Sequence, residues 1–282
     1  MTTAQICVLG SVNLDMIIQT KNLPRAGETI AQGVFQSLPG GKGANVALAA
    51  QRLGADVDLR AAIGADDYAA QALTFLKSSG VNLDNLITIE NNHTGLAFIN
   101  VAETGENQIA VASGANDAFK PAHLSPITAK GIITQFEIPI ETIEAAIKGY
   151  EGFVAINASP VIEGLERLLP YASLIIVNEG ESHAYEQALR SYEGLLAITL
   201  GAKGAKLLKA GKVLAEAKPP QVEVVDTTGA GDSFAAALTV ALMEGQLPEK
   251  ALHFACAVGA LTTTKIGTQA ATPYRTDVET II

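Results

Sequence analysis

The sequence is long, acidic and rather apolar, and these bulk properties exclude several classes of protein. Its 282 residues carry a formal net charge of −10, with 48% hydrophobic and 17% charged residues, a globular rather than a disordered composition. The acidic balance and the lack of any run of Lys and Arg argue against nucleic-acid binding, because phosphate contacts need clustered positive charge. No apolar stretch approaches the roughly 20 residues of a membrane-spanning helix, so we expect no membrane association.

The cysteines and histidines predict neither a disulfide nor a zinc site. Cys7 and Cys256 are the two cysteines, and they lie far apart in apolar segments, which indicates buried free thiols in a reducing compartment. The histidines show no ligand spacing with each other or with the cysteines. The first residues, MTTAQICVLG, lack the basic flank and cleavage site of a signal peptide and predict a strand. We therefore expect a cytoplasmic protein.

Short apolar runs alternate with helical patterns along most of the chain. The apolar runs predict strands over residues 6–12, 56–64, 131–138, 153–160, 174–180 and 195–201. Helical spacing predicts helices over residues 45–54, 66–80, 141–150, 181–190, 232–244 and about 248–262. This alternation predicts an α/β fold with a doubly wound, mostly parallel, Rossmann-like central sheet that is covered by helices on both faces.

Two stretches, residues 17–41 and 94–116, interrupt this alternation. The second has strand patterns on both sides of a TGEN turn and predicts a hairpin. Together they predict a small antiparallel β lid over the carboxyl edge of the parallel strands, where ligands bind in open α/β sheets; two surface insertions without function are the alternative. The predicted division is an α/β domain over residues 1–16, 42–93 and 113–282, with the lid at 17–41 and 94–112.

A glycine-rich segment, LPGGKGANVALAA, precedes the first predicted helix. It is not a P-loop, because Lys42 is not followed by Ser or Thr, and the first strand lacks the glycines of a dinucleotide fingerprint. Gly40, Gly41 and Gly43 let the backbone approach a ligand closely at the entrance to a helix, with Lys42 and Asn45 beside it. A simple turn is the alternative interpretation.

Two polar residues, Asn13 and Asp15, follow the first predicted strand in the segment GSVNLD. Their spacing of two places both side chains on one face if the chain is extended. A carboxylate accepts two hydroxyl protons and a carboxamide both donates and accepts, so the pair suits a vicinal diol. Turn residues after a strand are the alternative.

The segment VVDTTGAGDSF, residues 224–234, joins a β-rich run to an apolar helical pattern. The free N–H groups of residues 229–232 are therefore expected at a helix N-terminus, where the macrodipole and the unpaired donors favour an anion such as a phosphate. Asp232 would lie at the edge of this anion hole, facing the group that attacks the phosphate. An N-cap or first-turn acid is the alternative role for Asp232.

With these segments in view, the sequence resembles the ribokinase-like sugar kinase family over nearly its whole length. The resemblance rests on GGKGANVALAAQRLG and on the highly specific DTTGAGDSFAAAL, and the spellings GSVNLD, PRAGET, TGLAFINV and GENQIAVASGAN are similar to those of the ribose-phosphorylating branch. It implies ATP-dependent, Mg²⁺-assisted transfer of a phosphoryl group to the 5-hydroxyl of D-ribose. A kinase for another pentose, a ketohexose or a nucleoside is the alternative, and a catalytically silent sugar-binding regulator is a third.

The resemblance also implies roles for matching residues. Asp232 would be the general base, and Gly229, Ala230 and Gly231 would supply the anion hole. The sugar would be held by Asn13, Asp15, Gly41, Lys42, Asn45 and Glu137, together with Asp232. Asn178 and Glu181 would organise Mg²⁺ and the phosphates, mostly through water, and Thr199, Gly201 and Gly204 would form the nucleotide-binding turn.

A monovalent cation, K⁺, and a homodimer through the lid are implied as well. The cation would be held by the carboxylate of Asp226 and the carbonyl groups of Thr228, Thr262, Lys265 and Gly267; a structural cap is the alternative role for Asp226. Three departures from the family pattern are Val177 where proline is usual, Ala271 where serine is common, and a shortened region between residues 181 and 197. The last of these leaves the nucleotide preference open.

Overall fold

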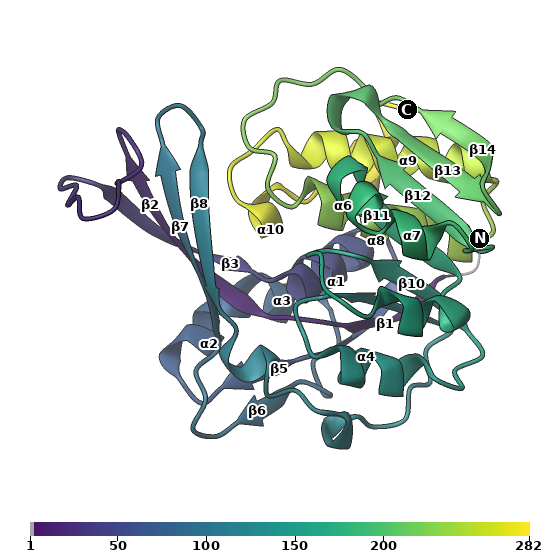
Figure 1. Cartoon of the computed structure of the whole chain (residues 1–282), viewed down its shortest axis with the longest axis horizontal. Coiled ribbons are helices and arrows are strands. Elements are labelled where there is room, and N and C mark those ends of the chain that lie inside the picture. The colour runs from purple at the N-terminus through teal and green to yellow at the C-terminus, as the bar shows by residue number, and fades with distance from the viewer. Residues whose placement is uncertain (1–2) are drawn as a thin grey trace.

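The computed structural model describes residues 3–282 and contains a large central sheet with a small sheet standing off one end (Figure 1). The central sheet has eight strands in the order β14-β13-β12-β11-β10-β9-β1-β4. The strands are β1 (Gln5–Leu9), β4 (Asp56–Arg60), β9 (Gly131–Gln135), β10 (Phe153–Asn157), β11 (Leu174–Asn178), β12 (Leu195–Thr199), β13 (Ala205–Lys209) and β14 (Lys212–Ala217). Neighbours from β4 to β12 are parallel, and β13 and β14 add two antiparallel pairs. The mostly parallel sheet is confirmed, and the β13–β14 hairpin is an addition that the sequence did not predict.

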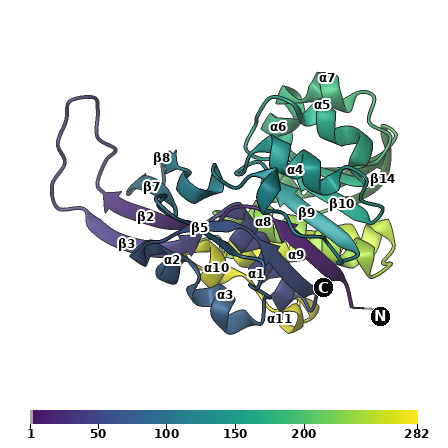
Figure 2. The same cartoon turned by 90° about the horizontal axis from the view of Figure 1, so that it is seen from below.

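Helices cover both faces of this sheet (Figure 2). One layer holds α1 (Lys42–Arg52), α3 (Thr74–Ser79), α8 (Ala230–Met243), α9 (Pro248–Thr262) and α11 (Arg275–Glu279). The other holds α4 (Ile140–Ile147), α5 (Leu165–Leu168), α6 (Glu179–Ala184) and α7 (Glu186–Leu189). Each layer buries its own apolar cluster against the sheet, which is why parallel strands read as continuous apolar runs. The doubly wound layout is confirmed.

Several predicted elements are divided in the structure. The strand predicted at 56–64 becomes β4 and β5 (Ala62–Gly64), and β5 pairs with β6 (Ile87–Ile89) instead of the central sheet. The helix predicted at 66–80 becomes α2 (Asp67–Ala72) and α3, and the one at 181–190 becomes α6 and α7. A further short helix, α10 (Thr268–Ala271), and one-turn 3₁₀ helices at Gly114–Asn116, Pro121–His123, Leu169–Tyr171 and Gly201–Lys203 complete the described chain.

The small sheet is formed by the residues for which the lid was predicted, and its strands are in the order β3-β2-β7-β8; we refer to it as the lid. It contains β2 (Asn13–Thr20), β3 (Val34–Gly40), β7 (Gly95–Ala102) and β8 (Asn107–Ala112). The predicted hairpin is the antiparallel β7–β8 pair, and β2–β3 is also antiparallel, but the central β2–β7 pair is parallel. β2 begins at Asn13, so the lid strand starts four residues before the boundary expected at residue 17.

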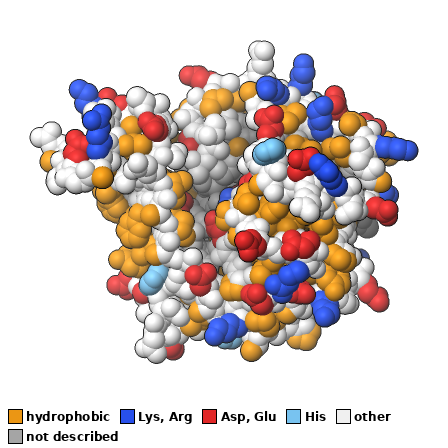
Figure 3. Space-filling view, in the orientation of Figure 1, with side chains coloured by type: hydrophobic (Ala, Val, Ile, Leu, Met, Phe, Trp, Pro, Cys, Tyr) orange, Lys and Arg blue, Asp and Glu red, His pale blue; other side chains and the backbone are white. Residues whose placement is uncertain are grey.

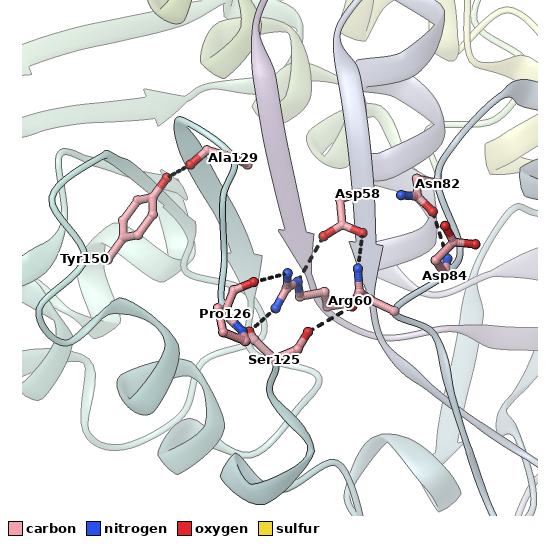
Figure 4. Close-up of polar contacts among 9 residues, drawn as sticks. Asp58, Arg60, Asn82, Asp84, Ser125, Pro126, Ala129 and Tyr150 are labelled. Atoms are coloured by element: carbon pink, nitrogen blue, oxygen red, sulfur yellow. Dashed lines mark hydrogen bonds and ion pairs between the residues drawn. The ribbon is translucent and has the colours of Figure 1, made fainter.

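A buried arginine ties the edge of the central sheet to the segment before β9 (Figure 4). Arg60 on β4 is only 4% exposed. Its Nε donates to Asp58 Oδ2 at 3.0 Å, and its terminal nitrogens donate to the carbonyl oxygens of Ser125 and, at 2.8 Å, Pro126. Asn85 also donates to Asp58, at 2.9 Å. The buried positive charge is therefore paired and hydrogen-bonded, as burial of a charge requires.

None of the helices in residues 3–282 has the length and apolar character needed to cross a membrane.

Candidate active site

The residues predicted to form an anion hole, Gly229, Ala230 and Gly231, lie at the N-terminus of α8. Gly229 is the N-cap with φ +76°, and Ala230 and Gly231 open the helix, two residues earlier than predicted. A side chain at Gly229 would be strained by this φ, and its Cβ would lie 1.9 Å from Thr268 Cγ2, so glycine is required there. The Ala230 N–H donates weakly to Thr227 O at 3.3 Å. The first N–H groups of a helix have no hydrogen-bond partners within the helix. Here they lie at the positive end of the helix dipole, which suits an anion.

Asp232 lies at the third position of α8 and is 5% exposed. Its Oδ2 accepts a hydrogen bond from Asn45 Nδ2 at 2.9 Å, and its Oδ1 accepts one from Asn157 Nδ2 at 3.3 Å. Lys42 Nζ lies 3.8 Å from Asp232 Oδ1. The N-cap is Gly229, so Asp232 does not cap the helix, and its carboxylate instead faces α1 and the carboxyl end of β10.

Three carboxylates share this site with one ammonium group. Burial and, to a smaller extent, the negative charges of Glu137 and Asp232 raise the pKa of Asp15 to about 7, although the positive charge of Lys42 opposes this shift. The pKa of Lys42 is raised, chiefly by the attraction of Asp232. Without a ligand, Asp15 is therefore a carboxyl group that is only partly ionised at neutral pH, and a polar ligand that hydrogen-bonds it would favour the charged form.

Glu137, just beyond β9, is held by groups on two other segments. Its Oε2 accepts hydrogen bonds from the Ser11 hydroxyl and from the Lys42 N–H, the latter at 3.1 Å. Ser11 was not predicted as a site residue. These bonds fix one carboxylate oxygen against the start of α1, so only the other is left to face a ligand.

The glycines before α1 make room for protein atoms. A Cβ at Gly40 would lie 2.2–2.4 Å from the carboxylate of Asp15. A Cβ at Gly41 would lie 2.6 Å from the Asn13 N atom, and Gly41 also has a φ of +89°. A Cβ at Gly43 would lie 2.5 Å from the Ser11 N atom. The glycines were predicted to let a ligand approach the backbone closely. In this structure they instead let their own backbone approach Asp15 and the connection between β1 and β2. The simple-turn interpretation does not explain these contacts.

Asn13 and Asp15 lie on β2, and the chain there is extended as predicted. Asn116 fixes the amide of Asn13, because its Nδ2 donates to Asn13 Oδ1 at 2.8 Å and its Oδ1 accepts from the Val12 N–H at 3.0 Å. The NH₂ group of Asn13 is consequently the end available to a ligand. Asn116 and Asn157 were both missed by the sequence analysis; the position of Asn157 at the carboxyl end of a parallel strand was the signal that could have found it.

Asn178 and Glu181 form a capping box at the start of α6. Asn178 Oδ1 accepts from the Glu181 N–H, and Glu181 Oε2 accepts from the Asn178 N–H, both at 2.8 Å. The single side-chain oxygen of Asn178 and one of the two carboxylate oxygens of Glu181 are therefore occupied in capping the helix. Glu181 still contributes to the raised pKa of Lys42, which places its charge within reach of the site.

A cavity of about 640 Å³ lies beside the N-terminus of α8. Thr199, Gly201 and Gly204 line one side of it, and Ala230 and Gly231 line another. Its remaining walls include Pro219, Pro220, Val222, Val224, Phe234, Cys256, Gly259, Ala260 and Thr263. The structure therefore brings the predicted nucleotide turn and the anion hole to one apolar-walled space. Figure 3 shows the wider hollow between the lid, at the left, and the α/β domain.

Asp226 links two loops behind the anion hole. Its Oδ1 accepts from the N–H and hydroxyl of Thr228 at 2.9 and 2.7 Å, and its Oδ2 accepts from the Gly267 N–H at 3.2 Å. Thr262 is the last residue of α9, and Lys265 and Gly267 lie between α9 and α10. No group of three or more His, Cys, Asp or Glu able to hold a metal occurs in residues 3–282. An ion here would therefore depend on hydroxyl and carbonyl oxygens besides the single carboxylate, a donor set that suits a hard cation.

Comparison with known proteins agrees with this geometry. A family model described as the pfkB family carbohydrate kinase matches residues 3–275. The chain belongs to the pfkB family of carbohydrate kinases. Among curated relatives, the ribokinase of Bacillus subtilis is 37% identical over 98% of this chain and 99% of its own length.

Solved structures extend the likeness to the fold. The ribokinase of Thermotoga maritima has a TM-score of 0.88 and 30% identity, with 99% of each chain covered. The Arabidopsis thaliana ribokinase complexed with ribose and ATP has a TM-score of 0.84 and 29% identity, also with 99% of each chain covered. The fold is therefore ribokinase-like, and the pfkB member described here is an ATP-dependent carbohydrate kinase.

Proposed function

We propose that this enzyme is a ribokinase, which transfers the γ-phosphate of ATP to the 5-hydroxyl of D-ribose. The observation that carries the proposal is the buried carboxylate of Asp232, hydrogen-bonded to two amides and placed three residues into a helix whose N-terminal N–H groups border the 640 Å³ cavity. Full-length likeness to the Bacillus subtilis ribokinase supports the choice of sugar. Phosphoryl transfer needs positioning and charge stabilisation more than covalent chemistry, and both are available here.

The sugar is held on the lid side of Asp232. Asp15 accepts hydrogen bonds from two ribose hydroxyls, and the free NH₂ of Asn13 donates to an oxygen of the same diol. Gly41, Lys42, Asn45 and Glu137 complete the sugar site. Asp232 takes the proton of the 5-hydroxyl as this oxygen attacks the phosphorus, and the nearby Lys42, 3.8 Å away, steadies the negative charge on the carboxylate.

The phosphates lie at the N-terminus of α8. The N–H groups of Gly229, Ala230 and Gly231 stabilise the charge that develops on the transferring phosphoryl group, and the helix dipole adds to this. Thr199, Gly201 and Gly204 hold the nucleotide in the 640 Å³ cavity. Asn178 and Glu181 act through water on Mg²⁺, which neutralises phosphate charge when it is bound. The capping box leaves Glu181 Oε1 and the Asn178 NH₂ group free, and these groups fit this indirect role.

An assay of ADP release with a panel of sugars and nucleosides tests the proposal. Ribose should give the highest kcat/KM, and NMR of the product should show phosphate on the 5-hydroxyl. A higher kcat/KM with another pentose, a ketohexose or a nucleoside would show that this compound, and not ribose, is the substrate. Ribose binding without ADP release would instead indicate a silent sugar-binding regulator. Running the panel with ATP and GTP also tests the nucleotide preference, which the short region between residues 181 and 197 leaves open.

A monovalent cation, K⁺, is proposed behind the anion hole. Asp226 and the carbonyl groups of Thr228, Thr262, Lys265 and Gly267 would hold it, and it would order the loop before α8. The hydrogen bonds from Thr228 and Gly267 to Asp226 support this placement, although they also suit a purely structural cap. Activity should rise severalfold when K⁺ replaces Na⁺. Equal activity with the two ions would mean that Asp226 serves only as a structural cap.

The lid is proposed to pair with a second copy of the chain. It carries exposed apolar side chains at Val34, Phe35, Phe98, Ile109 and Val111, and orange side chains gather on the lid in Figure 3. Burying such side chains is the main driving force of association. Sizing chromatography should show a dimer for the wild type and a monomer for Phe98→Asp, whereas a monomeric wild type would contradict the pairing. ATP as the donor and two free, buried cysteines fit a cytoplasmic location.

A further inference from the structure

A buried glutamine on α10 is linked to the proposed base through one intervening side chain. Gln269 is 1% exposed, and its Nε2 donates to Asn45 Oδ1 at 3.3 Å and to the carbonyl oxygen of Gly40 at 3.5 Å. Asn45 Nδ2 in turn donates to Asp232 Oδ2 at 2.9 Å. A continuous path therefore runs from a backbone carbonyl group through two amides to the carboxylate.

The direction of each amide in this path is set by its neighbour. A backbone carbonyl oxygen only accepts, so the side chain of Gln269 must present its NH₂ group to Gly40. The same NH₂ group then meets Asn45, which must offer its oxygen and turn its own NH₂ group toward Asp232. Reversing the Asn45 amide would place oxygen against the Asp232 carboxylate and nitrogen against the Gln269 nitrogen, leaving two buried polar contacts unfavourable.

The backbone around Gln269 is itself anchored. Arg52, at the end of α1, donates through Nη1 to the carbonyl oxygens of Gln269 at 2.8 Å and Thr272 at 2.6 Å. Gly40 is the last residue of the lid strand β3, and Asn45 lies in the first turns of α1. The Gln269 side chain on α10 thus connects the lid strand β3 with α1, beside the proposed base. Helix α10 directly follows the loop of the proposed cation site.

We propose that Gln269 is a positioning residue for phosphoryl transfer: it locks the Asn45 amide so that its NH₂ group holds the Asp232 carboxylate correctly aimed. This rests on the proposed function, because it assumes that Asp232 is the base. Gln269 contacts neither sugar nor nucleotide, and it acts only through Asn45. Its removal leaves the Asn45 amide free to rotate, so that Asp232 loses a dependable hydrogen-bond donor and the sugar loses its contact with that amide, while the nucleotide contacts persist.

The test is Gln269→Met, which keeps the side-chain length and removes both donors. We expect kcat to fall about tenfold, since one hydrogen bond to a charged group is lost, with the KM for ATP changed less than threefold. In an Asp232→Ala background, measured with radiolabelled ATP, the same substitution should produce no further loss. Gln51→Met, on the same helix as Asn45, is the matched control and should keep kcat within twofold.

Two outcomes overturn the inference: a normal kcat in Gln269→Met, or an equal tenfold loss in the Asp232→Ala background, which would indicate a general structural role. If Gln269→Met does not fold by circular dichroism, Gln269→Asn replaces it, because its amide is polar but too short to reach Asn45. All ratios are measured with the sugar that gives the highest kcat/KM in the panel, so an error about ribose does not affect them.

Discussion

Two clusters of buried charge, around Arg60 and around Asp232, differ in how well their charges are balanced. The guanidinium group of Arg60 is matched by one carboxylate and two backbone carbonyl groups. Around Asp232, the carboxylates of Asp15 and Glu137 add to its negative charge, with Lys42 as the ammonium group that opposes them. The first cluster is complete in itself, whereas the second is short of positive charge and of hydrogen-bond donors until a ligand arrives.

This difference separates structure from function. A balanced buried cluster contributes to the unique packing of the fold, and breaking it costs stability. A buried cluster with unbalanced charges raises the pKa of a carboxyl group and lowers the stability of the folded state. Such energetically unfavourable clusters are typical of binding and catalytic sites. The following substitutions test whether the Arg60 cluster affects only stability and the Asp232 cluster chiefly activity.

Asp232→Asn should have the largest effect, on activity alone. It removes the proton acceptor, so kcat should fall by about 10²–10⁴, measured by steady-state ADP release. The stability to urea should change little, because asparagine has nearly the same shape and the substitution relieves repulsion from Asp15 and Glu137. A variant that still phosphorylates at close to the wild-type rate would show that Asp232 is not the base.

Arg60→Met should have the opposite profile. The loss of the guanidinium group leaves Asp58 without its partner and two carbonyl groups without donors, so the free energy of unfolding should fall by about 3 kcal/mol. Urea titration measures this loss, and kcat per folded molecule should remain within twofold. Arg190→Met is the control: Arg190 pairs with Glu186 on the surface, its side chain is 75% exposed, and its loss should leave the urea midpoint nearly unchanged. Equal losses in both variants would contradict the contrast.

Asp15→Asn should stabilise the protein while it weakens sugar binding. Because the pKa of Asp15 in the folded state, about 7, is above its ordinary value of 3.8, the folded state holds this proton more tightly than the unfolded state does. The cost of ionising Asp15 is therefore absent below pH 4, grows as the pH rises, and is complete above pH 7.

At pH 8 the variant should gain roughly 2–4 kcal/mol in the free energy of unfolding, and at pH 4 it should gain almost nothing. Urea titrations at both values measure the difference. A gain that is equal at both pH values would show that the effect does not come from ionisation of Asp15.

Much of the fold and part of the site followed from local sequence. Parallel strands buried on both faces read as apolar runs, and the glycines before Asp232 indicated a helix N-terminus that is observed at Gly229. The β13–β14 hairpin was missed because its alternating strands lie on an edge and have the weak apolar signal of half-exposed residues. The parallel β2–β7 pair of the lid could not be predicted either, because it joins segments distant in the sequence.

The polar network was the least accessible to sequence reasoning. Asn157 and Gln269 are ordinary residues in their own segments, and each matters only because the fold brings it to Asp232 or to Asn45. The raised pKa of Asp15 likewise depends on burial by the assembled fold and on the charges of Glu137, just beyond β9, and Asp232 on α8. Arg60 gave no local signal, since a single arginine in a strand is usually exposed. These features are properties of the assembled site rather than of any motif.

Gly40→Ala should have the smallest effect, confined to the sugar. The new Cβ would lie 2.2–2.4 Å from the Asp15 carboxylate, which must turn away from its present position. Because Asp15 holds the sugar and does not accept the proton, the KM for ribose should rise about tenfold, the loss of one charged hydrogen bond, with kcat changed less than threefold. Gly105→Ala, at the tip of the β7–β8 turn, is the control: its φ of +84° strains alanine, but its Cβ meets nothing within 4 Å. It should cost about 1 kcal/mol of stability with an unchanged KM. An unchanged KM in Gly40→Ala would mean that sugar binding does not depend on the present position of the Asp15 carboxylate beside Gly40.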